Sequence, residues 1–388
     1  MRKKILKILA AIGLLSLAFV HWFLPAIVES SMNVVLPHTA YQIRPAAARL
    51  HESLFIADLH TDSLLWKRNL LKRSDTGQID LPRLQEGNVA LQVFSATTKS
   101  PSGQNYDQNT GDSDNITLLA VVQFWPISSW GSLYERARYQ LQKLWSFAEK
   151  SDGQLVVIQT KSDMRSFVER RAAGENITAG VYLIEGAHPF EGDIENLDRL
   201  FEQGLRVSGL THFFDNELGG SLHGISGEGL TPFGKQVIVR AGELGLIIDV
   251  AHASPAMVSD VLEISERPVI LSHGGVKGVC DTNRNLEDSL MLEIADKGGI
   301  LGVGFWDGAI CDASPLGIVR AIRYAIDLMG IDHVALGSDY DGAVTTLLDT
   351  SELAILTQTM MDEGFSVQEI RSVMGENVRR FLLENLPD

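Results

Sequence analysis

Eight short apolar runs recur along this chain of 388 residues, and amphipathic or charged stretches separate them. The runs cover residues 54–62, 89–96, 180–185, 206–212, 246–252, 269–273, 300–306 and 334–339. Continuous apolar strands that alternate with helices are typical of parallel strands buried on both faces. Eight such units predict an α/β fold, a (β/α)8 TIM-like barrel. A ninth run, residues 155–159, exceeds this count, and we expect it to be an accessory strand.

Polar side chains collect where these runs end, namely His60, Asp62, Glu185, His212, His252, His273 and Asp339. In a barrel the C-terminal ends of the strands converge on one face, where the active sites of such folds lie. An isolated histidine is usually structural, but four at equivalent places, together with three carboxylates, indicate a functional site. His333 precedes its run and belongs to the opposite face, whereas His188 and His223 fall in loops near the expected site.

The residue types at this site predict two metal ions. His60 and Asp62 alternate along one strand and therefore point to the same side. With Glu185, His252 and His273 they make five potential ligands, whereas one catalytic zinc usually takes three protein ligands and water. A carboxylate can bridge two ions, and Glu185 is central in the order of ligands. Paired metals about 3.5–4 Å apart can hold a hydroxide and polarise a carbonyl. Mixed histidine and carboxylate ligands suit Zn2+ best, with manganese, cobalt or iron as alternatives.

The composition excludes other kinds of function. The formal net charge is −16, and an acidic surface argues against nucleic-acid binding, which needs a basic patch. Only Cys280 and Cys311 are present, and without a Cys-x-x-Cys motif neither a zinc finger nor a thioredoxin-type site is indicated. These two cysteines would be able to form one disulfide in an exported protein, but the sequence alone leaves open whether they meet.

The N-terminal segment differs from the rest of the chain. Arg2, Lys3 and Lys4 precede an apolar stretch, and residues 8–28 are long enough to cross a bilayer as a helix, which needs about 20 residues. A cleaved signal peptide is the alternative. We expect an uncleaved transmembrane helix with its positive end in the cytoplasm, which places the remainder outside, in the periplasm or the extracellular space.

The expected organisation has three parts. Residues 1–28 form the membrane anchor or signal segment, residues 29–53 a linker and lead-in, and residues 54–388 the barrel. Within the barrel, residues 98–131 form a long excursion after one strand. Such an excursion is often a lid or rim of the site, and a plain surface insertion is an equal alternative.

Eight motifs together resemble the membrane dipeptidase (renal dipeptidase) family of zinc metallopeptidases, in family order over residues 54–381. They are Asp58-Leu-His-Thr-Asp62, Ile184-Glu-Gly-Ala-His188, Gly209-Leu-Thr-His212, Gly229-Leu-Thr-Pro-Phe-Gly234, Ile248-Asp-Val-Ala-His252, Leu271-Ser-His273, Asn283-Arg284-Asn285 and Gly337-Ser-Asp-Tyr-Asp-Gly342. The resemblance implies a binuclear zinc dipeptidase on a barrel of the metal-dependent hydrolase type. By motif position, His60 and Asp62 would hold one Zn2+, and His252 and His273 the other, with Glu185 as the bridge.

The resemblance also implies how a dipeptide substrate would be bound and cleaved. His212 and Arg284 would bind the substrate, and a metal-bridging hydroxide would attack the scissile carbonyl while zinc and His212 stabilise the oxyanion. Asp339 would contact the substrate, accept the proton and return it to the leaving amine. A homodimer is an expectation of the family alone.

This chain departs from the family pattern in three ways. Trp306 stands where relatives often have tyrosine, and residues 98–131 show no clear family pattern, so side-chain preference could differ. The N-terminal helix also replaces the lipid anchor of the mammalian relatives.

Two alternatives remain. A related metal-dependent hydrolase would cleave other small amides or esters, such as N-acyl-D-amino acids, lactams or lactones. The second alternative is a barrel whose metal site is not catalytic, but the presence of all five expected ligands argues against it.

Overall fold

The computed structural model describes residues 3–5, 7, 19 and 21–388. Within this part of the chain, eight parallel strands close into a barrel, because the last strand pairs back onto the first. In order around the barrel they are β2 (Ile56–Thr61), β3 (Val89–Thr97), β5 (Thr178–Glu185), β6 (Leu205–Gly209), β7 (Ile247–Asp249), β8 (Ile270–Gly274), β9 (Ile300–Val303) and β10 (Val334–Leu336). The predicted (β/α)8 barrel is confirmed. The ninth run forms β4 (Leu155–Val157), which pairs in parallel with the first three residues of β5, residues 178–180, outside the ring of eight strands, as expected for an accessory strand.

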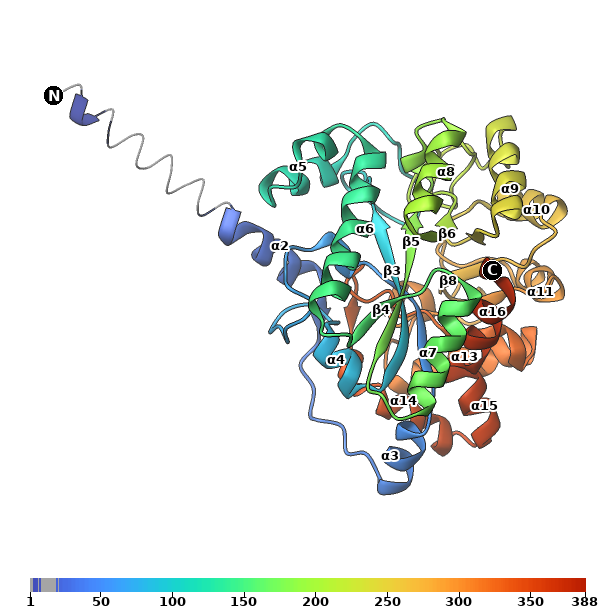
Figure 1. Ribbon diagram of the computed structural model, residues 1–388. Coiled ribbons are helices and arrows are strands. Elements are labelled where there is room, and N and C mark those ends of the chain that lie inside the picture. Colours follow the sequence, from blue (N-terminus) through green and yellow to red (C-terminus); the bar gives the residue numbers. More distant parts are fainter. Residues whose placement is uncertain (1–2, 6, 8–18, 20) are drawn as a thin grey trace.

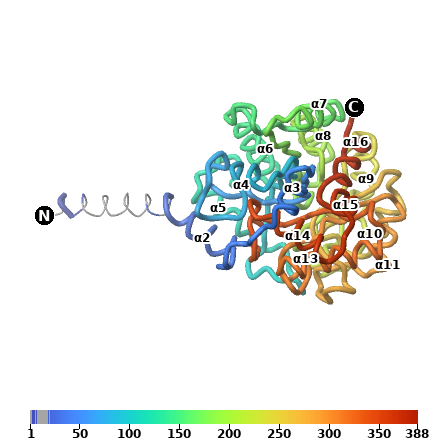
Figure 2. Tube along the Cα trace, turned by 90° about the horizontal axis from the view of Figure 1, so that it is seen from below, coloured from blue at the N-terminus to red at the C-terminus, as the bar shows by residue number. Residues whose placement is uncertain are grey.

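Helices surround the barrel on the outside (Figures 1 and 2). They are α4 (Leu81–Glu86), α6 (Leu133–Lys150), α7 (Lys161–Ala172), α8 (Ile194–Gln203), α9 (Pro232–Leu244), α10 (Pro255–Ile264), α11 (Asp288–Asp296), α12 (Asp307–Ile310), α13 (Pro315–Met329), α14 (Ala354–Asp362), α15 (Val367–Arg371) and α16 (Asn377–Asn385). Short 3-10 turns occur at Ser63–Leu65, Ile127–Trp130, His188–Phe190, Ile331–His333 and Thr350–Glu352, and a π-helical turn at Ser372–Glu376.

Local sequence signals explain where helices begin. The hydroxyl of Thr231 accepts a hydrogen bond from the backbone of Gly234 at the start of α9, and that of Ser254 accepts one from Met257 at the start of α10. Proline follows each cap at the first helical position, where its missing N–H costs nothing.

The alternation of side chains along the strands places core residues on the outside of the barrel and site residues on the inside. Leu59, Val93 and Leu183 point outward and form one buried apolar cluster with residues of α7 and α16. Their sequence neighbours therefore point into the barrel, because successive side chains of a strand face opposite sides. This places Asp58 and His60 inside, where both are almost fully buried.

The residues that precede the barrel pack against it. They form α2 (Leu24–Met32), β1 (Val34–Val35) and α3 (Pro45–Glu52), and β1 pairs with β11 (Thr345–Thr346) near the other end of the chain. The apolar segment predicted to span the membrane, residues 8–28, lies for the most part outside the described residues. Among the helices that are described, none is long and apolar enough to cross a bilayer.

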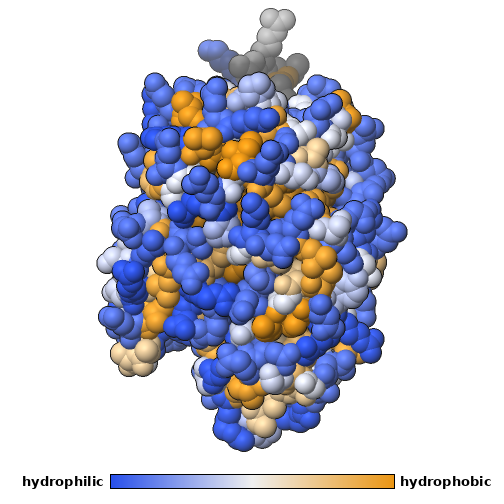
Figure 3. All heavy atoms as spheres, turned by 90° about the vertical axis from the view of Figure 1, so that its right-hand side faces the viewer, coloured by the Kyte–Doolittle hydropathy of each residue, from blue (hydrophilic) through white to orange (hydrophobic). Residues whose placement is uncertain are grey.

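The excursion after β3 forms part of the barrel's rim and carries α5 (Asn115–Val122). Its shape depends on Arg136 of α6, a buried guanidinium that donates to the carbonyls of Thr98 (2.7 Å), Ser129 (2.8 Å) and Trp130 (2.9 Å). The same group pairs with Asp114 at 2.6 Å. One cation therefore satisfies polar groups from several turns of the excursion, and α5 comes to lie beside α2 (Figures 1 and 2). On the face that forms the right-hand side of Figure 1, the surface carries mainly hydrophilic side chains, with hydrophobic ones in small groups (Figure 3).

A disulfide joins Cys280 to Cys311, and thus links the loop after β8 to the end of α12. We expect the double substitution Cys280→Ser, Cys311→Ser to lower the free energy of unfolding by roughly 3–4 kcal/mol, because closing a loop of this length restricts the unfolded chain. Urea unfolding with and without reductant measures the effect. Reductant should destabilise the wild type and leave the double variant unaffected; equal stability of the two proteins under oxidising conditions would contradict the role of the bond.

Candidate active site

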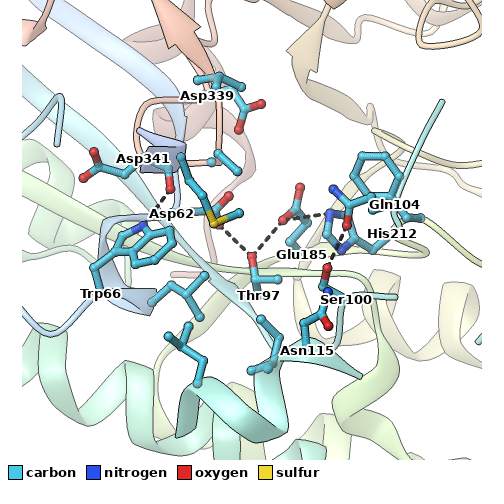
Figure 4. A pocket seen from close by; sticks show the side chains of 18 of the residues that line it. Asp62, Trp66, Thr97, Ser100, Gln104, Asn115, Glu185, His212, Asp339 and Asp341 are labelled. Carbon is cyan, nitrogen blue, oxygen red and sulfur yellow. Dashed lines mark hydrogen bonds and ion pairs between the residues drawn. The ribbon is translucent and has the colours of Figure 1, made fainter. Parts of the chain in front are cut away.

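The structure brings the predicted site residues together at the C-terminal face of the barrel (Figure 4). They come from the ends of six strands or the loops that follow, and each is less than a tenth exposed: His60, Asp62, Glu185, His212, His252, His273, Arg284 and Asp339. These side chains are far apart in the sequence and meet only because the strands are parallel and converge at this face.

Glu185 lies at the centre of this cluster. Its Oε1 atom is 3.2 Å from Nε2 of His252, 3.4 Å from Nε2 of His273 and 3.6 Å from Nε2 of His60. Its Oε2 atom is 3.3 Å from Nε2 of His212. Four imidazoles thus direct the same ring nitrogen toward one carboxylate.

The backbone is strained where it delivers two of these side chains. His252 has φ of +62° and Asp339 has φ of +61°, which is the left-handed region that L-residues with a Cβ avoid. Such a conformation costs on the order of 1–3 kcal/mol and persists where the surrounding structure enforces it. Each of these residues follows the end of its strand and turns its side chain into the cluster, so the strain serves the site.

Two aspartates that we assigned no role hold the strand ends in place. Asp249 of β7 accepts hydrogen bonds from both the backbone N–H (2.9 Å) and the hydroxyl (2.6 Å) of Ser272 on β8. Asp58 of β2 accepts the equivalent pair from Ser338, which follows β10. Each aspartate also accepts a hydrogen bond from the backbone N–H two residues later in the sequence: Asp58 from His60, and Asp249 from Ala251. The same lock therefore occurs twice, and each copy joins two neighbouring strands.

Ser272 also orients two of the imidazoles. Its Oγ atom is 3.2 Å from Nδ1 of His60 and 2.9 Å from Nδ1 of His273. Because these Nδ1 atoms face the hydroxyl, the Nε2 atoms face the cluster, which is the usual way a protein fixes a metal-binding histidine. His60, Asp249 and His273 also converge closely enough to suggest a metal group of their own, but the Ser272 hydroxyl lies among them.

Thr97 is another residue that the sequence interpretation missed. Its hydroxyl lies 2.9 Å from Asp62 and 3.0 Å from Glu185 (Figure 4). The predicted strand ends at residue 96 without a charged side chain or histidine, but β3 continues to Thr97. The hydroxyl of Thr97, one position beyond the predicted strand end, was the only sequence signal that could have indicated its place in the site.

The electrostatics of the cluster fit divalent metal ions. Nε2 of His60 is buried with no hydrogen-bond partner among the described residues, and carboxylates of Asp62, Glu185 and Asp339 surround it at 3.6–3.9 Å. Burial lowers the pKa of this imidazole, but Asp62 and Glu185 outweigh it and raise the pKa to about 10. The surrounding carboxylates thus favour a positive charge at Nε2 of His60. Either a proton or a metal ion can supply this charge.

The other imidazoles have the form that metal ligation needs. Burial, together with nearby cationic groups such as Arg284, holds the pKa values of His252 and His273 well below their usual range, so both rings are neutral. Burial raises the pKa of Glu185, but His212 and His252 outweigh it and keep this carboxylate ionised. Neutral imidazoles and ionised carboxylates are the donor set that zinc prefers. The groups His60, Asp62, Glu185 and Glu185, His212, His252 each have ligand atoms within 4.8 Å of one another.

Three further histidines, which the sequence analysis places outside the ligand set, lie where their positions in the sequence predict. His223 contacts the carbonyl of Tyr106 through Nδ1 at 2.9 Å and packs against His252, whereas the ring of His188 packs against Phe214. Both are buried beside the site. His333 precedes β10 and bonds the carbonyl of Gly299 at 2.8 Å, away from the cluster.

Arg284 lies over the cluster from the loop after β8. Its guanidinium donates to the carbonyl of His273 at 2.7 Å and lies 5.5 Å from the ring of Trp306. The indole N–H of Trp306 donates to the hydroxyl of Tyr106 at 2.8 Å. Two of the three departures from the family pattern, Trp306 and the excursion, therefore contact each other directly above the site.

A cavity of about 590 Å3 opens onto these residues. Asp62, Glu185, His212, Arg284 and Asp339 line its inner part. Arg284 and the carboxylates thus face a space large enough for a small organic ligand, since such pockets usually measure about 300–1,000 Å3.

Comparison with known proteins identifies relatives. The membrane dipeptidase family (peptidase family M19) matches residues 44–385. A dipeptidase of Aspergillus oryzae is 27% identical over 355 residues, which cover 84% of this chain and 77% of that protein. Among solved structures, the probable dipeptidase PvdM of Pseudomonas aeruginosa is 22% identical with a TM-score of 0.73, over 88% of this chain and 98% of that one. A metallopeptidase of Rhodobacter sphaeroides, solved with a phosphinate mimic of the dipeptide L-Ala-D-Ala, is 23% identical with a TM-score of 0.68, over 86% and 99% of the two chains.

Replacement of Glu185 by glutamine tests the metal site. The amide has the same shape but no negative charge, so it would offset less of the positive charge of a bound ion, and we expect the variant to hold less metal per chain than the wild type. Elemental analysis of the purified protein after dialysis measures this loss. Glu369→Gln, at a partly buried ion pair with Arg323 remote from the cluster, is the matched control and should keep the wild-type metal content. Unchanged metal in Glu185→Gln would contradict the assignment.

Proposed function

The chain belongs to the membrane dipeptidase family and is a metal-dependent dipeptidase, and we propose that it cleaves dipeptides with two zinc ions held by His60, Asp62, Glu185, His252 and His273. The observation that carries this proposal is the convergence of four imidazole Nε2 atoms on the buried carboxylate of Glu185. Bound there, zinc would supply a hydroxide at neutral pH and an electrophile for the scissile carbonyl.

The chain's own residues would orient the substrate and move its protons. His212 lines the cavity beside Glu185 and would stabilise the negative charge that develops on the carbonyl oxygen. Arg284 would bind the C-terminal carboxylate, because its planar guanidinium suits two parallel hydrogen bonds. Asp339 borders the cluster 3.9 Å from His60 and would take a proton from the attacking water and give it to the leaving amine.

A substrate panel tests this function. The purified protein, loaded with zinc and assayed for metal content, is given dipeptides, N-acyl-D-amino acids, lactams and lactones. Dipeptides should be hydrolysed with the highest kcat/KM, and chelation should abolish the activity. Preference for an acylated amino acid or a lactam would favour the related hydrolase instead, and full activity in a verified metal-free sample would end the metal hypothesis.

Asp339→Asn separates proton transfer from metal binding. The asparagine side chain keeps the shape of aspartate but cannot accept the proton, so kcat should fall by about 10²–10⁴-fold. Metal content should stay close to that of the wild type, which elemental analysis checks on the same samples. Parallel loss of metal and kcat would instead make Asp339 a ligand.

Arg284→Lys tests recognition of the substrate carboxylate. A hydrogen bond to a charged group contributes roughly 1.5–3 kcal/mol, and lysine cannot reproduce the guanidinium fork. The variant should therefore lose about 10–150-fold in kcat/KM for a free dipeptide. The wild type should prefer the dipeptide acid over its C-terminal amide, and the variant should discriminate less. A variant with the full preference would show that another residue binds the carboxylate.

We propose in addition that the N-terminal segment anchors the protein in a membrane, with the barrel outside the cytoplasm. The surface at this end supports the idea, because seven large apolar residues are each more than half exposed: Phe19, Trp22, Phe23, Ile27, Leu118, Phe124 and Ile127. The rings of His21 and Phe124 contact at 4.1 Å, which brings the two groups of the patch together. Exposed apolar patches of this kind mark contact surfaces, and tryptophan favours the membrane interface. The disulfide fits an oxidising compartment.

Removal of residues 1–20 tests the anchor and leaves α2 intact. The full chain should sediment with membranes and resist extraction by high salt, whereas the shortened chain should be released by salt or remain soluble. Sequencing of the native N-terminus provides the second measurement. A mature chain that begins beyond residue 28 would exclude an uncleaved anchor.

A further inference from the structure

The cavity extends well beyond the residues that the proposed chemistry uses. Away from the cluster, apolar side chains of α2, α5 and the turn after β2 form a continuous surface, which we call the apolar wall: Leu24, Val28, Met32, Trp66, Leu119 and Val122. A dipeptide of two small residues would fill only the inner part of the 590 Å3 volume. The apolar wall has no part in holding metal or moving protons.

The apolar wall is held in place by contacts outside the cavity. Trp66 is 2% exposed, and its indole N–H donates to the carbonyl of Asp341 at 2.8 Å. Glu29 of α2 pairs with Arg68 at 2.5 Å, and Arg68 in turn pairs with Asp341. These contacts fix α2 and Trp66 to the loop that carries Asp339, so the wall has a defined position relative to the site.

The topology of the barrel places this wall opposite Arg284. Arg284 follows β8, whereas α5 follows β3. Around the closed sheet β3 and β8 are separated by three strands in either direction, so they lie across the barrel from each other. Figure 4 shows Trp66 and Asp62 on one side of Thr97 and Glu185, with His212 on the other. A dipeptide whose carboxylate binds Arg284 and whose carbonyl lies over the cluster therefore extends its N-terminal residue toward the apolar wall.

We propose that the apolar wall is the subsite for the side chain of the substrate's N-terminal residue. It selects dipeptides in which this residue carries a large aliphatic or aromatic side chain, while the C-terminal residue lies under Arg284 and Trp306. The inference rests on the proposed dipeptidase function and adds the substrate class to it. Burial of one methylene group is worth about 0.8 kcal/mol, which corresponds to roughly fourfold in kcat/KM.

Two mirrored series of substrates test the subsite in the zinc-loaded full chain. In the first, alanine, norvaline and norleucine precede a C-terminal alanine; in the second, the same residues follow an N-terminal alanine. We expect kcat/KM to rise by up to fourfold for each added methylene in the first series and to stay nearly level in the second. Equal rises in both series would overturn the proposal.

Variants of α5 locate the effect. Leu119→Asn should reduce the ratio of kcat/KM between norleucyl-alanine and alanyl-alanine by at least fourfold, because an amide replaces part of the wall. Leu118→Asn provides a second variant that the fold should tolerate, since Leu118 lines the cavity and is 66% exposed. The matched control is Leu292→Asn, an exposed leucine of α11 outside the cavity, which should keep the wild-type ratio. If both α5 variants keep that ratio, the wall is not the subsite.

Calorimetry separates failure of the subsite from failure of the proposed function. Non-hydrolysable phosphinate mimics of alanyl-alanine and norleucyl-alanine are titrated into the same preparation. Tighter binding of the norleucyl mimic, with a more negative heat-capacity change from apolar burial, supports the subsite even if no dipeptide is cleaved. Equal affinity and equal heat-capacity change overturn it, whatever the activity.

Discussion

The buried carboxylate of Glu185 is the interaction on which the site depends. It lies within 3.2–3.6 Å of four imidazole nitrogens. Three of these rings come from the ends of the neighbouring strands β6, β7 and β8, and the fourth, His60, comes from β2, which β9 and β10 separate from β8. An ionised carboxylate in such a place is stable only when positive charge faces it, because desolvation of an isolated charge is costly. Metal ions or protons must therefore balance the negative charge of Glu185. The fold holds the imidazole rings close enough to this carboxylate to bind either.

The two aspartate–serine locks hold the strands that carry the proposed metal ligands. Asp249 and Ser272 join β7 to β8, and Asp58 and Ser338 join β2 to the end of β10. In each lock one carboxylate satisfies both a backbone N–H and a hydroxyl, so the polar groups are paired where water is excluded. The two locks thus order the strand ends that carry the proposed ligands, which is what pre-organisation of a catalytic site requires.

The sequence predicted the barrel and brought together the right strand ends, because both depend on repeating local patterns. The apolar runs reveal buried strands, and parallel topology alone makes residues as distant as His60 and His273 neighbours. Thr97, Asp249 and Ser272 escaped prediction, since their roles arise from single contacts between strands that no periodicity records. The excursion at residues 98–131 was ambiguous for the same reason: its fold depends on one buried arginine, Arg136, whose partners lie on separate turns.

The lock between Asp58 and Ser338 spans 280 residues of sequence. It closes the barrel, since β10 pairs with β2 in register at Leu336 and Asp58. Contacts of such long range form late, because the chain loses loop entropy before they repay it. During synthesis, the strand with His60 and Asp62 therefore waits for nearly the whole chain before its neighbour on that side exists. A fragment that ends before β10 already contains the five proposed metal ligands, but it lacks both the closed barrel and Asp339, so truncation there removes the closing strand and the proposed proton acceptor together.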